Sequence, residues 1–334
     1  MLLTLAACAF TSVTMAQPRQ VPAYGAELQR FNYPFSVQTF AFTSQGQRLS
    51  MAYMDVPAGR PNGRTAVLMH GKNFCAATWE TTIRSLNAQG FRVIVPDQIG
   101  FCKSTKPASY QYSLHQLAHN TAGLAQALGV NRIVLIGHSM GGMLAMRYAL
   151  LYPAQIDALV LVNPIGLEDW KANGVPYQSV DAWYQNELKT SFESIKNYQL
   201  NTYYNGQWRT EYDRWVDMLA GMYASEGRER VAWNQALTSD MVYTQPVIYE
   251  LENLKAATLL MIGERDTTAI GKNLAPPEVA TKLGNYAKLG RAAAQRIPNA
   301  RLVTFPDLGH SPHIQDPDQF NKALRENLMQ VLTR

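Results

Sequence analysis

From position 65 onward the chain alternates between two patterns of hydrophobic and polar residues. Short apolar runs are continuous rather than alternating, as expected for parallel strands that are buried on both faces. These runs lie at 65–70, 91–97, 132–138, 157–163, 257–263 and 301–305. Longer amphipathic stretches between them have the length and period of helices, at 77–90, 114–129, 140–153 and 318–332. The alternation predicts an α/β fold, with a mostly parallel sheet and helices on both of its faces.

Two segments depart from this rhythm. Residues 36–44 and 48–56 flank Gln45-Gly46-Gln47 and predict an antiparallel hairpin at the edge of the sheet. Between about 165 and 250 the chain is helical and polar-aromatic in pattern, and it holds five of the six tryptophans. Such an interruption predicts an inserted lid. The expected domains are a core at 17–164 and 251–334, and a helical lid at 165–250.

Composition and charge narrow the class of protein. The 334 residues are 47% hydrophobic and 16% charged, which is typical of a folded globular chain. The net charge is +5, but the basic residues are scattered, so binding to nucleic acid is not supported. After the first residues no run is long and apolar enough to cross a membrane, so no integral membrane span is expected.

The first sixteen residues carry no charge and are apolar or small, and a polar QPRQ segment follows. This pattern predicts a signal peptide cleaved after Ala16. Its basic segment is missing, so the leader is expected to begin upstream of Met1. Alternatively, Leu5-Ala6-Ala7-Cys8 is similar to a bacterial lipobox, in which case Cys8 would be lipidated. Both interpretations predict an exported protein, periplasmic or secreted, and a buried N-terminal segment is the third alternative.

The strongest candidate for chemistry is Gly137-His138-Ser139-Met140-Gly141-Gly142, which fits G-x-S-x-G between an apolar run and a helical pattern. Its glycines allow a tight strand-to-helix turn that exposes the Ser139 Oγ above the sheet. The N-terminus of the next helix directs N–H groups and partial positive charge to the same place. Ser139 is therefore predicted to be a nucleophile. The alternative is a glycine-rich turn without a chemical role.

A serine nucleophile needs a base, and the base needs a carboxylate to orient it. Asp266 and His310 each follow an apolar run late in the chain. Loops after parallel strands open at the same edge of a sheet, so these side chains can converge on Ser139. Glu168 and Asp169 also follow a strand and are the competing acids. His313, near His310, is expected to be a structural neighbour.

Taken together, these motifs resemble the α/β-hydrolase superfamily, specifically its lid-bearing, esterase-like branch. The resemblance covers residues 36–334 and implies Ser139 as nucleophile, Asp266 as acid and His310 as base. It is specific for the fold and the triad but not for a substrate, because the scaffold carries many reactions. The motifs that carry it are HG (70–71), DQIGFCKS (97–104), GHSMGG (137–142), GERD (263–266) and GHSPHIQDP (309–317).

The resemblance also implies an oxyanion hole. His70-Gly71 would open the oxyanion loop, and the backbone N–H groups of Lys72 and Met140 would be the donors. Relatives often have an aromatic residue or proline after His-Gly, whereas this chain has Lys72-Asn73. The Lys72 side chain is expected to point outward or to meet an acidic substrate. The residues expected to support the loop and the elbow are His70, Gly71, Gly137, His138 and Gly141.

The chain has three cysteines, Cys8, Cys75 and Cys102, and removal of the leader would leave an even pair in an oxidising compartment. In the family's sheet, the strands before Cys75 and Cys102 are immediate neighbours. The resemblance therefore implies a disulfide that braces the oxyanion loop, with two free, packed thiols as the alternative. Asp97, in the same region, is expected to stabilise a loop.

The predicted function is a serine carboxylic ester hydrolase (EC 3.1.1 class) that acts on a small-molecule ester or lactone through an acyl-enzyme. No organic cofactor is expected, and no metal, because His115 and His119 share a helical face without a third ligand. Oligomeric state is not predicted. The same scaffold leaves two alternatives open, a C–C bond hydrolase of a dienoic diketo acid and a cofactor-free perhydrolase. A binding protein on an inactive scaffold is disfavoured, since no triad member is lost.

Overall fold

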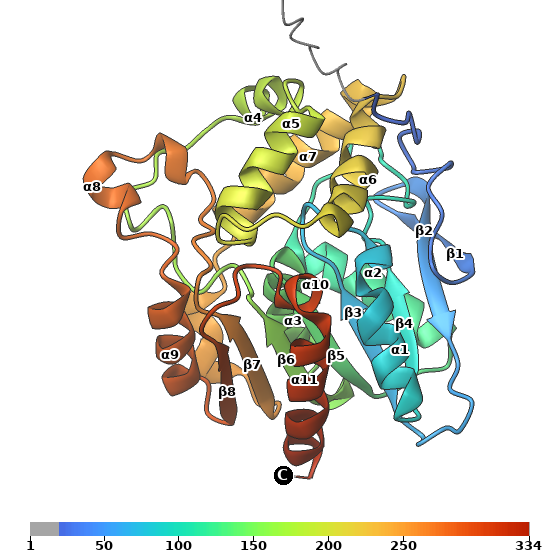
Figure 1. Cartoon of the computed structure of the whole chain (residues 1–334). Helices are drawn as coiled ribbons and strands as arrows, with labels where there is room; N and C mark the ends of the chain where they lie inside the picture. Colours follow the sequence, from blue (N-terminus) through green and yellow to red (C-terminus); the bar gives the residue numbers. More distant parts are fainter. Residues whose placement is uncertain (1–19, 334) are drawn as a thin grey trace, which may run out of the picture.

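The protein is described by a computed structural model over residues 20–333 (Figure 1), so the predicted leader and Cys8 lie outside the described residues. Within that range, eight strands form one sheet in the order β1-β2-β4-β3-β5-β6-β7-β8. The strands from β3 to β8 are parallel to one another, and β1 and β2 are antiparallel to their neighbours. The bounds are β1 (Val37–Ser44), β2 (Gln47–Val56), β3 (Thr65–Met69), β4 (Arg92–Pro96), β5 (Ile133–His138), β6 (Ile156–Val162), β7 (Thr258–Gly263) and β8 (Ala300–Phe305).

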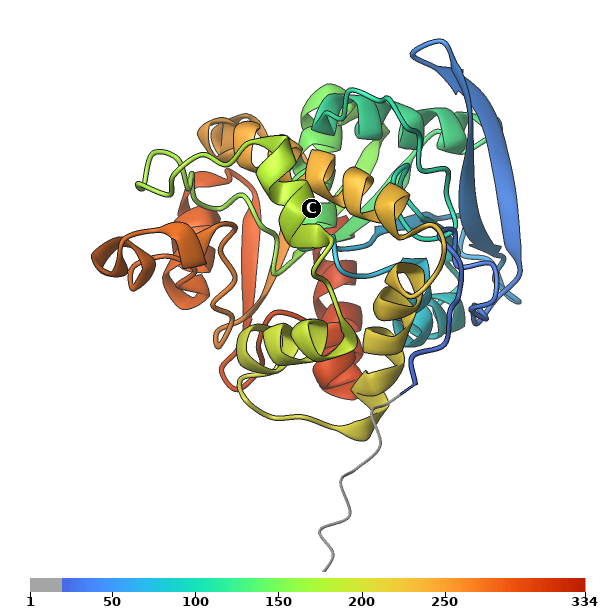
Figure 2. The same ribbon diagram turned by 90° about the horizontal axis from the view of Figure 1, so that it is seen from above.

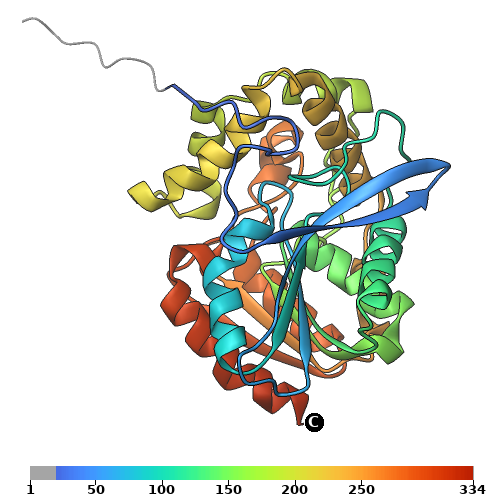
Figure 3. The same cartoon turned by 90° about the vertical axis from the view of Figure 1, so that its right-hand side faces the viewer.

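Helices cover both faces of the sheet, which confirms the predicted fold class. On one face lie α1 (Glu80–Ala88) and α11 (Pro317–Leu332), and Figure 3 shows them across the sheet from the helices of the other face. The opposite face is covered by α2 (Leu114–Ala127), α3 (Met140–Leu151) and α9 (Tyr286–Arg296). Two short helices, α8 (Pro277–Ala280) and α10 (Pro312–Gln315), lie in the loops after β7 and β8.

The continuous apolar runs follow from this two-sided burial. In β3, Ala66 and Leu68 belong to the core beneath α1 and α11, whereas Val67 and Met69 belong to the core beneath α2 and α3. Successive side chains of a strand point to opposite faces, so both faces of β3 must be apolar. If polar and apolar residues alternated in β3, the polar side chains would all lie on one face and would be buried there away from water.

Local signals set the helix and hairpin ends. The Ser113 hydroxyl accepts a 2.9 Å hydrogen bond from the Gln116 N–H and caps α2, as expected for a serine at this position. Gly129, shortly after α2, takes a left-handed φ of 70°.

In the hairpin, Gln47 already belongs to β2, so the turn is shorter than predicted. It consists of Gln45 and Gly46, both with positive φ, as the twist of a two-residue hairpin requires.

The segment between β6 and β7, residues 163–257 and called here the insertion, is mostly helical. It contains α4 (Val180–Glu187), α5 (Phe192–Tyr198), a π-helical turn at Gln199–Tyr203, α6 (Asp213–Tyr223) and α7 (Arg228–Thr244). These helices gather at one end of the sheet, and Figure 2 shows them from above. The insertion touches the loop after β3 through Asn73 and Tyr203, and the loop after β8 through Tyr203 and His310. It therefore covers the ends of the strands from which the candidate residues emerge.

The segment at 20–35 runs from the insertion to the core. The Tyr24 N–H donates to the Gly221 carbonyl of α6, and the Tyr33 hydroxyl donates to Asp97 after β4. Over residues 20–333, no helix has the length and apolar character that a membrane span requires.

Candidate active site

Ser139 lies at a strained turn between β5 and α3. Its backbone has φ 55° and ψ −121°, in the left-handed half of the map that side chains with a Cβ avoid. The glycines around it are required by close contacts. A Cβ on Gly137 would lie 2.2 Å from the Gly141 carbonyl oxygen, and one on Gly141 would lie 2.3 Å from the Met69 carbonyl oxygen. The turn thus presses the start of α3 onto the end of β3 and holds the serine at the edge of the sheet.

Three loops bring Ser139, His310 and Asp266 together. The His310 Nε2 lies 2.8 Å from the Ser139 Oγ, and the His310 Nδ1 lies 2.6 Å from the Asp266 Oδ2. The three residues follow β5, β8 and β7, so they meet at the carboxyl edge of the parallel strands. His310 is completely buried, and Asp266 and Ser139 are 1% and 5% exposed. A hydroxyl, an imidazole and a carboxylate are thus joined in one line of hydrogen bonds, an arrangement that can support nucleophilic catalysis by serine.

Asp266 is held by two further groups. The Asn163 side-chain amide donates a 2.9 Å hydrogen bond to the Asp266 Oδ2, and the Thr268 N–H donates a 2.8 Å bond to the Oδ1. Asn163 is itself fixed, because its Oδ1 accepts a 2.8 Å bond from the Gly263 N–H. Sequence reasoning missed this residue. Its signal was a polar side chain directly after the apolar run Ala158–Val162, the place where the other candidates also appear.

The competing acids have different partners. The Glu168 Oε1 accepts hydrogen bonds from the Gly284 N–H at 2.9 Å and from the Trp170 indole at 3.2 Å. Burial raises the pKa of Glu168, which favours its neutral form relative to an exposed glutamate. Asp169 accepts from the Lys171 N–H and from the Tyr249 hydroxyl. Of the three carboxylates, Asp266 is the one hydrogen-bonded to His310.

The loop after β3, residues 70–75 and called here the β3 loop, passes directly beside the serine. A Cβ on Gly71 would lie 2.9 Å from the Ser139 Cβ and 3.0 Å from the His138 Nδ1, so only glycine fits. Met140 is the first residue of α3, and its N–H has no acceptor within the helix. The backbone of the β3 loop and the first residue of α3 therefore lie beside Ser139.

The Lys72 side chain does not point outward. It is 12% exposed, and its ammonium donates to the Glu187 Oε1 at 3.2 Å and to the Gln235 Oε1 at 2.8 Å. Glu187 ends α4 and Gln235 lies in α7, so the contact joins the β3 loop to two helices of the insertion. The Tyr223 hydroxyl also donates to Glu187, at 2.5 Å.

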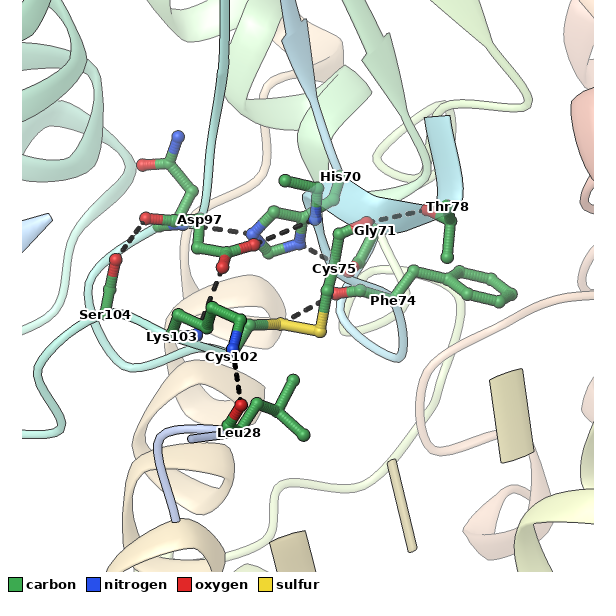
Figure 4. Close-up of a disulfide and its surroundings, with 12 residues drawn as sticks. Leu28, His70, Gly71, Phe74, Cys75, Thr78, Asp97, Cys102, Lys103 and Ser104 are labelled. Carbon is green, nitrogen blue, oxygen red and sulfur yellow. Dashed lines mark hydrogen bonds between the residues drawn. A yellow bond between two sulfur atoms is a disulfide. The ribbon is translucent and has the colours of Figure 1, made fainter. Parts of the chain in front are cut away.

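A disulfide and a buried carboxylate connect the β3 loop to the loop after β4 (Figure 4). Cys75 and Cys102 form a disulfide, with a Cα–Cα distance of 5.7 Å, between the loops after the neighbouring strands β3 and β4. The buried Asp97 carboxylate accepts from the Ala76 N–H at 2.8 Å and from the Lys103 N–H at 3.1 Å. Asp97 thus acts on the same two loops as the disulfide.

His70 also connects the β3 loop to the loop after β4. Its Nδ1 lies 2.9 Å from the Gly71 carbonyl oxygen, and its Nε2 accepts a 3.0 Å bond from the Gln98 N–H. Burial lowers the pKa of His70, consistent with a neutral ring. Potential metal-ligand atoms of His70, Asp97 and Cys102 lie within 4.8 Å of one another. The His70 nitrogens are both engaged and the Cys102 sulfur is in a disulfide, so this group does not fit a metal site.

Two further histidines pack behind His310. The His138 Nε2 faces the His310 carbonyl oxygen at 2.8 Å, and burial lowers the pKa of His138 well below its ordinary value. The His313 ring stacks on the buried Trp79 at 4.3 Å between ring centroids, and burial lowers the pKa of His313 to about 3. Both rings are therefore neutral at ordinary pH. They support the site as packing residues.

Comparison with known proteins assigns the family. The family model of the alpha/beta hydrolase fold matches residues 66–269, which is more than half of the chain. A probable hydrolytic enzyme from Pseudomonas aeruginosa PAO1, known from a crystal structure, is 63% identical with a TM-score of 0.92, over 93% of this chain and 99% of that chain. The chain belongs to the α/β-hydrolase fold family, as predicted, and is a hydrolase.

More distant relatives differ in their reactions. The 2-hydroxy-6-oxo-6-phenylhexa-2,4-dienoate hydrolase of Burkholderia cepacia is 27% identical over 267 residues, 78% of this chain and 86% of that protein. A thermophilic esterase from Thermogutta terrifontis is 23% identical with a TM-score of 0.67, over 88% of this chain and 99% of that chain. The esterase likeness shows the fold alone. The comparisons therefore support a hydrolase and do not identify the bond that is cleaved.

Proposed function

We propose that the protein is a serine hydrolase that cleaves carboxylic esters or lactones by acyl transfer to Ser139. The observation that carries this proposal is the buried line of contacts from the Ser139 Oγ through His310 to Asp266, with distances of 2.8 and 2.6 Å. A serine hydroxyl is a weak nucleophile until a base within hydrogen-bond reach accepts its proton. His310 has that reach.

In the first half of the reaction, the Ser139 Oγ attacks the substrate carbonyl while the His310 Nε2 takes the hydroxyl proton. The Asp266 carboxylate stabilises the imidazolium that forms and fixes the ring so that Nε2 faces the serine. His310 then returns the proton to the leaving alcohol, and the acyl group stays on Ser139.

The tetrahedral intermediate carries a negative oxygen that needs hydrogen-bond donors already in place. We assign this role to the backbone N–H groups of Lys72 and Met140. The support is the close approach of Gly71 to Ser139 and the position of Met140 as the first residue of α3. The positive end of the α3 dipole adds to the stabilisation. In the second half, His310 activates a water that releases the acid from Ser139.

Cleavage of a C–C bond next to a carbonyl is the second candidate. It is favoured by the 27% identity to the hydrolase of a phenylhexadienoate from Burkholderia cepacia. The same Ser139, His310 and Asp266 would serve, with a carbon rather than an oxygen leaving group.

The test starts from purified protein and a fluorophosphonate, a reagent that labels activated serines. We expect peptide mass spectrometry to find the label on Ser139, and Ser139→Ala to lose both labelling and hydrolysis of p-nitrophenyl esters. Ser109→Ala, in an exposed loop, is the matched control and should keep both. Label on another residue, or full activity in Ser139→Ala, would contradict the proposal. A panel of acyl chain lengths, lactones and a dienoic diketo acid separates ester from C–C cleavage.

We also propose that the insertion is a lid over Ser139 and that the protein is exported. The lid is supported by the contacts of Lys72 and Asn73 with the insertion. Export is supported by the Cys75–Cys102 disulfide, since such bonds persist in oxidising compartments. Fractionation of cells that express the full chain should place it outside the cytoplasm. A cytoplasmic product with an intact N-terminus would contradict export.

A further inference from the structure

Tyr203, in the insertion, packs directly on the candidate base. The phenol ring stacks on the His310 imidazole with 4.5 Å between ring centroids and 29° between the ring planes. Tyr203 is 4% exposed and ends the π-helical turn Gln199–Tyr203. Such single π-turns occur frequently at functional sites, because the wider turn re-aims one residue. Here the turn directs a tyrosine of the insertion at a histidine of the core.

The backbone of Tyr203 holds His310 as well. The His310 N–H donates a 3.0 Å hydrogen bond to the Tyr203 carbonyl oxygen. The preceding residue, Gly309, makes this approach sterically allowed, since a Cβ there would lie 2.1 Å from the same oxygen. His310 is therefore fixed to the insertion twice, through its main chain and through its ring.

The other end of the Tyr203 side chain is tied to the β3 loop. The Asn73 side-chain amide donates a 2.9 Å hydrogen bond to the Tyr203 hydroxyl, and the Phe74 ring lies 5.7 Å from the Tyr203 ring between centroids. Asn73 is two residues after Gly71, which passes beside Ser139. One side chain thus contacts both the loop that carries the base and the loop assigned to the oxyanion hole.

We propose that Tyr203 is a positioning residue for the reaction, one that sets the His310 ring and the β3 loop in their working geometry. The inference rests on the proposed serine hydrolase function. Its physical basis is that catalytic groups act efficiently only near their productive orientation, and a misplacement of about 1 Å can cost about a hundredfold in rate. A second consequence is that the insertion completes the site, so that catalysis requires it to be seated on the core.

The decisive comparison is Tyr203→Leu against Tyr204→Leu. Tyr204 is the matched control, since it is also buried and stacks on Tyr212 with 4.1 Å between ring centroids. Its ring meets Tyr203 edge-on at 6.5 Å between centroids, whereas the Tyr203 ring is the one stacked on His310. Both variants remove one tyrosine ring from the same cluster of the insertion. Tyr203→Phe keeps the ring on His310 and removes only the hydroxyl bonded to Asn73.

The readouts are kcat and KM for a short p-nitrophenyl ester, the rate constant of fluorophosphonate labelling at Ser139, and the midpoint of thermal unfolding. We expect Tyr203→Leu to lower kcat and the labelling rate about ten- to a hundredfold, with KM nearly unchanged. Tyr203→Phe should recover most of this loss and remain about two- to tenfold below the wild type. Tyr204→Leu should lower the unfolding midpoint at least as much while retaining kcat.

Two results would overturn the inference: a kcat and labelling rate of Tyr203→Leu within twofold of the wild type, or equal losses in Tyr203→Leu and Tyr204→Leu. The labelling rate needs no natural substrate, so it reports on the activation of Ser139 for any acyl reaction. Failure of the proposed function is recognised differently, by activity or labelling that survives in Ser139→Ala.

Discussion

The Asn163 amide donates a 2.9 Å hydrogen bond to the Asp266 Oδ2, the same oxygen that faces the His310 Nδ1 at 2.6 Å. Asn163 has a φ of 37°, so glycine is the substitution that removes the side chain without backbone strain. We expect Asn163→Gly to lower kcat about ten- to a hundredfold, the range for loss of a hydrogen bond to a charged group. An unchanged kcat in a folded variant would show that Asp266 needs no such support.

The choice of acid can be tested with a matched pair of amide variants. Asp266→Asn keeps the shape of the side chain but no longer stabilises an imidazolium, and we expect kcat to fall about 10⁴-fold, as for other triads. Glu168→Gln changes the competing acid, which accepts from Gly284 and Trp170, and should keep kcat within a few-fold. The kcat values of both variants are measured by steady-state kinetics on one ester. A larger loss of kcat in Glu168→Gln than in Asp266→Asn would assign the role of the acid to Glu168.

Removal of the disulfide should cost stability. The cysteines are 27 residues apart, and the loop-entropy estimate gives about 3–4 kcal/mol for a loop of this length. We expect Cys75→Ala/Cys102→Ala to lower the free energy of unfolding by this amount, measured with urea in parallel with reduced and oxidised wild type. Thiol titration of the native protein gives an independent check, because two free thiols would contradict the bond.

The buried histidines predict a stability loss in acid. Burial lowers the pKa of His313 to about 3, whereas a histidine in the unfolded chain takes up a proton below about pH 6.5. Between these values the unfolded state binds more protons, so the free energy of unfolding must fall as the pH decreases from about 6.5 toward 3. One such group contributes about 1.4 kcal/mol per pH unit within that window.

The variant His313→Phe isolates this contribution. Phenylalanine can keep the stacking on Trp79 but does not titrate, so the slope of stability against pH should flatten by about 1.4 kcal/mol per unit. Burial also lowers the pKa of His138, so the variant should keep the part of the pH dependence of stability that His138 contributes. Urea unfolding between about pH 4.5 and 6.5 measures the difference. Parallel curves for wild type and variant would refute the assignment.

The Lys72–Glu187 ion pair predicts the local stability of α4. None of the residues of α4 is fully buried, and its main apolar contact is the Tyr184 ring against Trp233 of α7, so we expect the polar contact at its C-terminal end to matter for its local stability. Glu187→Gln leaves the Lys72 ammonium without its carboxylate, and we expect amide hydrogens of α4 to exchange faster while those of β5 stay protected. Hydrogen-exchange mass spectrometry makes the comparison. Unchanged exchange in α4 would mean that the ion pair does not hold the insertion.

The positions of the parallel strands along the chain and the position of the elbow were predictable because they depend on local pattern. The runs at 65–70 and 132–138 became β3 and β5 with ends shifted by one residue at most, since strands buried on both faces must be apolar throughout. Ser139, Asp266 and His310 each lie in the loop or turn that follows such a run. Their meeting within hydrogen-bond distance follows from the parallel topology rather than from their spacing in the sequence.

Apart from the Asn163–Asp266 hydrogen bond, the contacts at the site that were not predicted are those made by the insertion. Tyr203 is one of many aromatic residues between 165 and 250, and nothing in its neighbourhood distinguishes a ring stacked on His310 from a ring in the core of the insertion. The Lys72 side chain was expected to point outward or to meet an acidic substrate. Its contacts with Glu187 and Gln235 could not be predicted, because these residues are 115 and 163 positions away in the sequence. The path of an irregular segment depends on many weak packing contacts, and these contacts leave no periodic pattern in the sequence.

The segment at 20–35 has a practical consequence for handling the protein. Its start lies against α6, where Tyr24 donates to Gly221, whereas α11 ends at the opposite end of the molecule (Figure 1). A bulky fusion partner placed just before residue 20 would crowd α6 and the neighbouring helices of the insertion. An affinity tag or immobilisation linker attached after α11 leaves those helices facing the solution, so the C-terminal end is the better point of attachment for purification and for surface-bound assays.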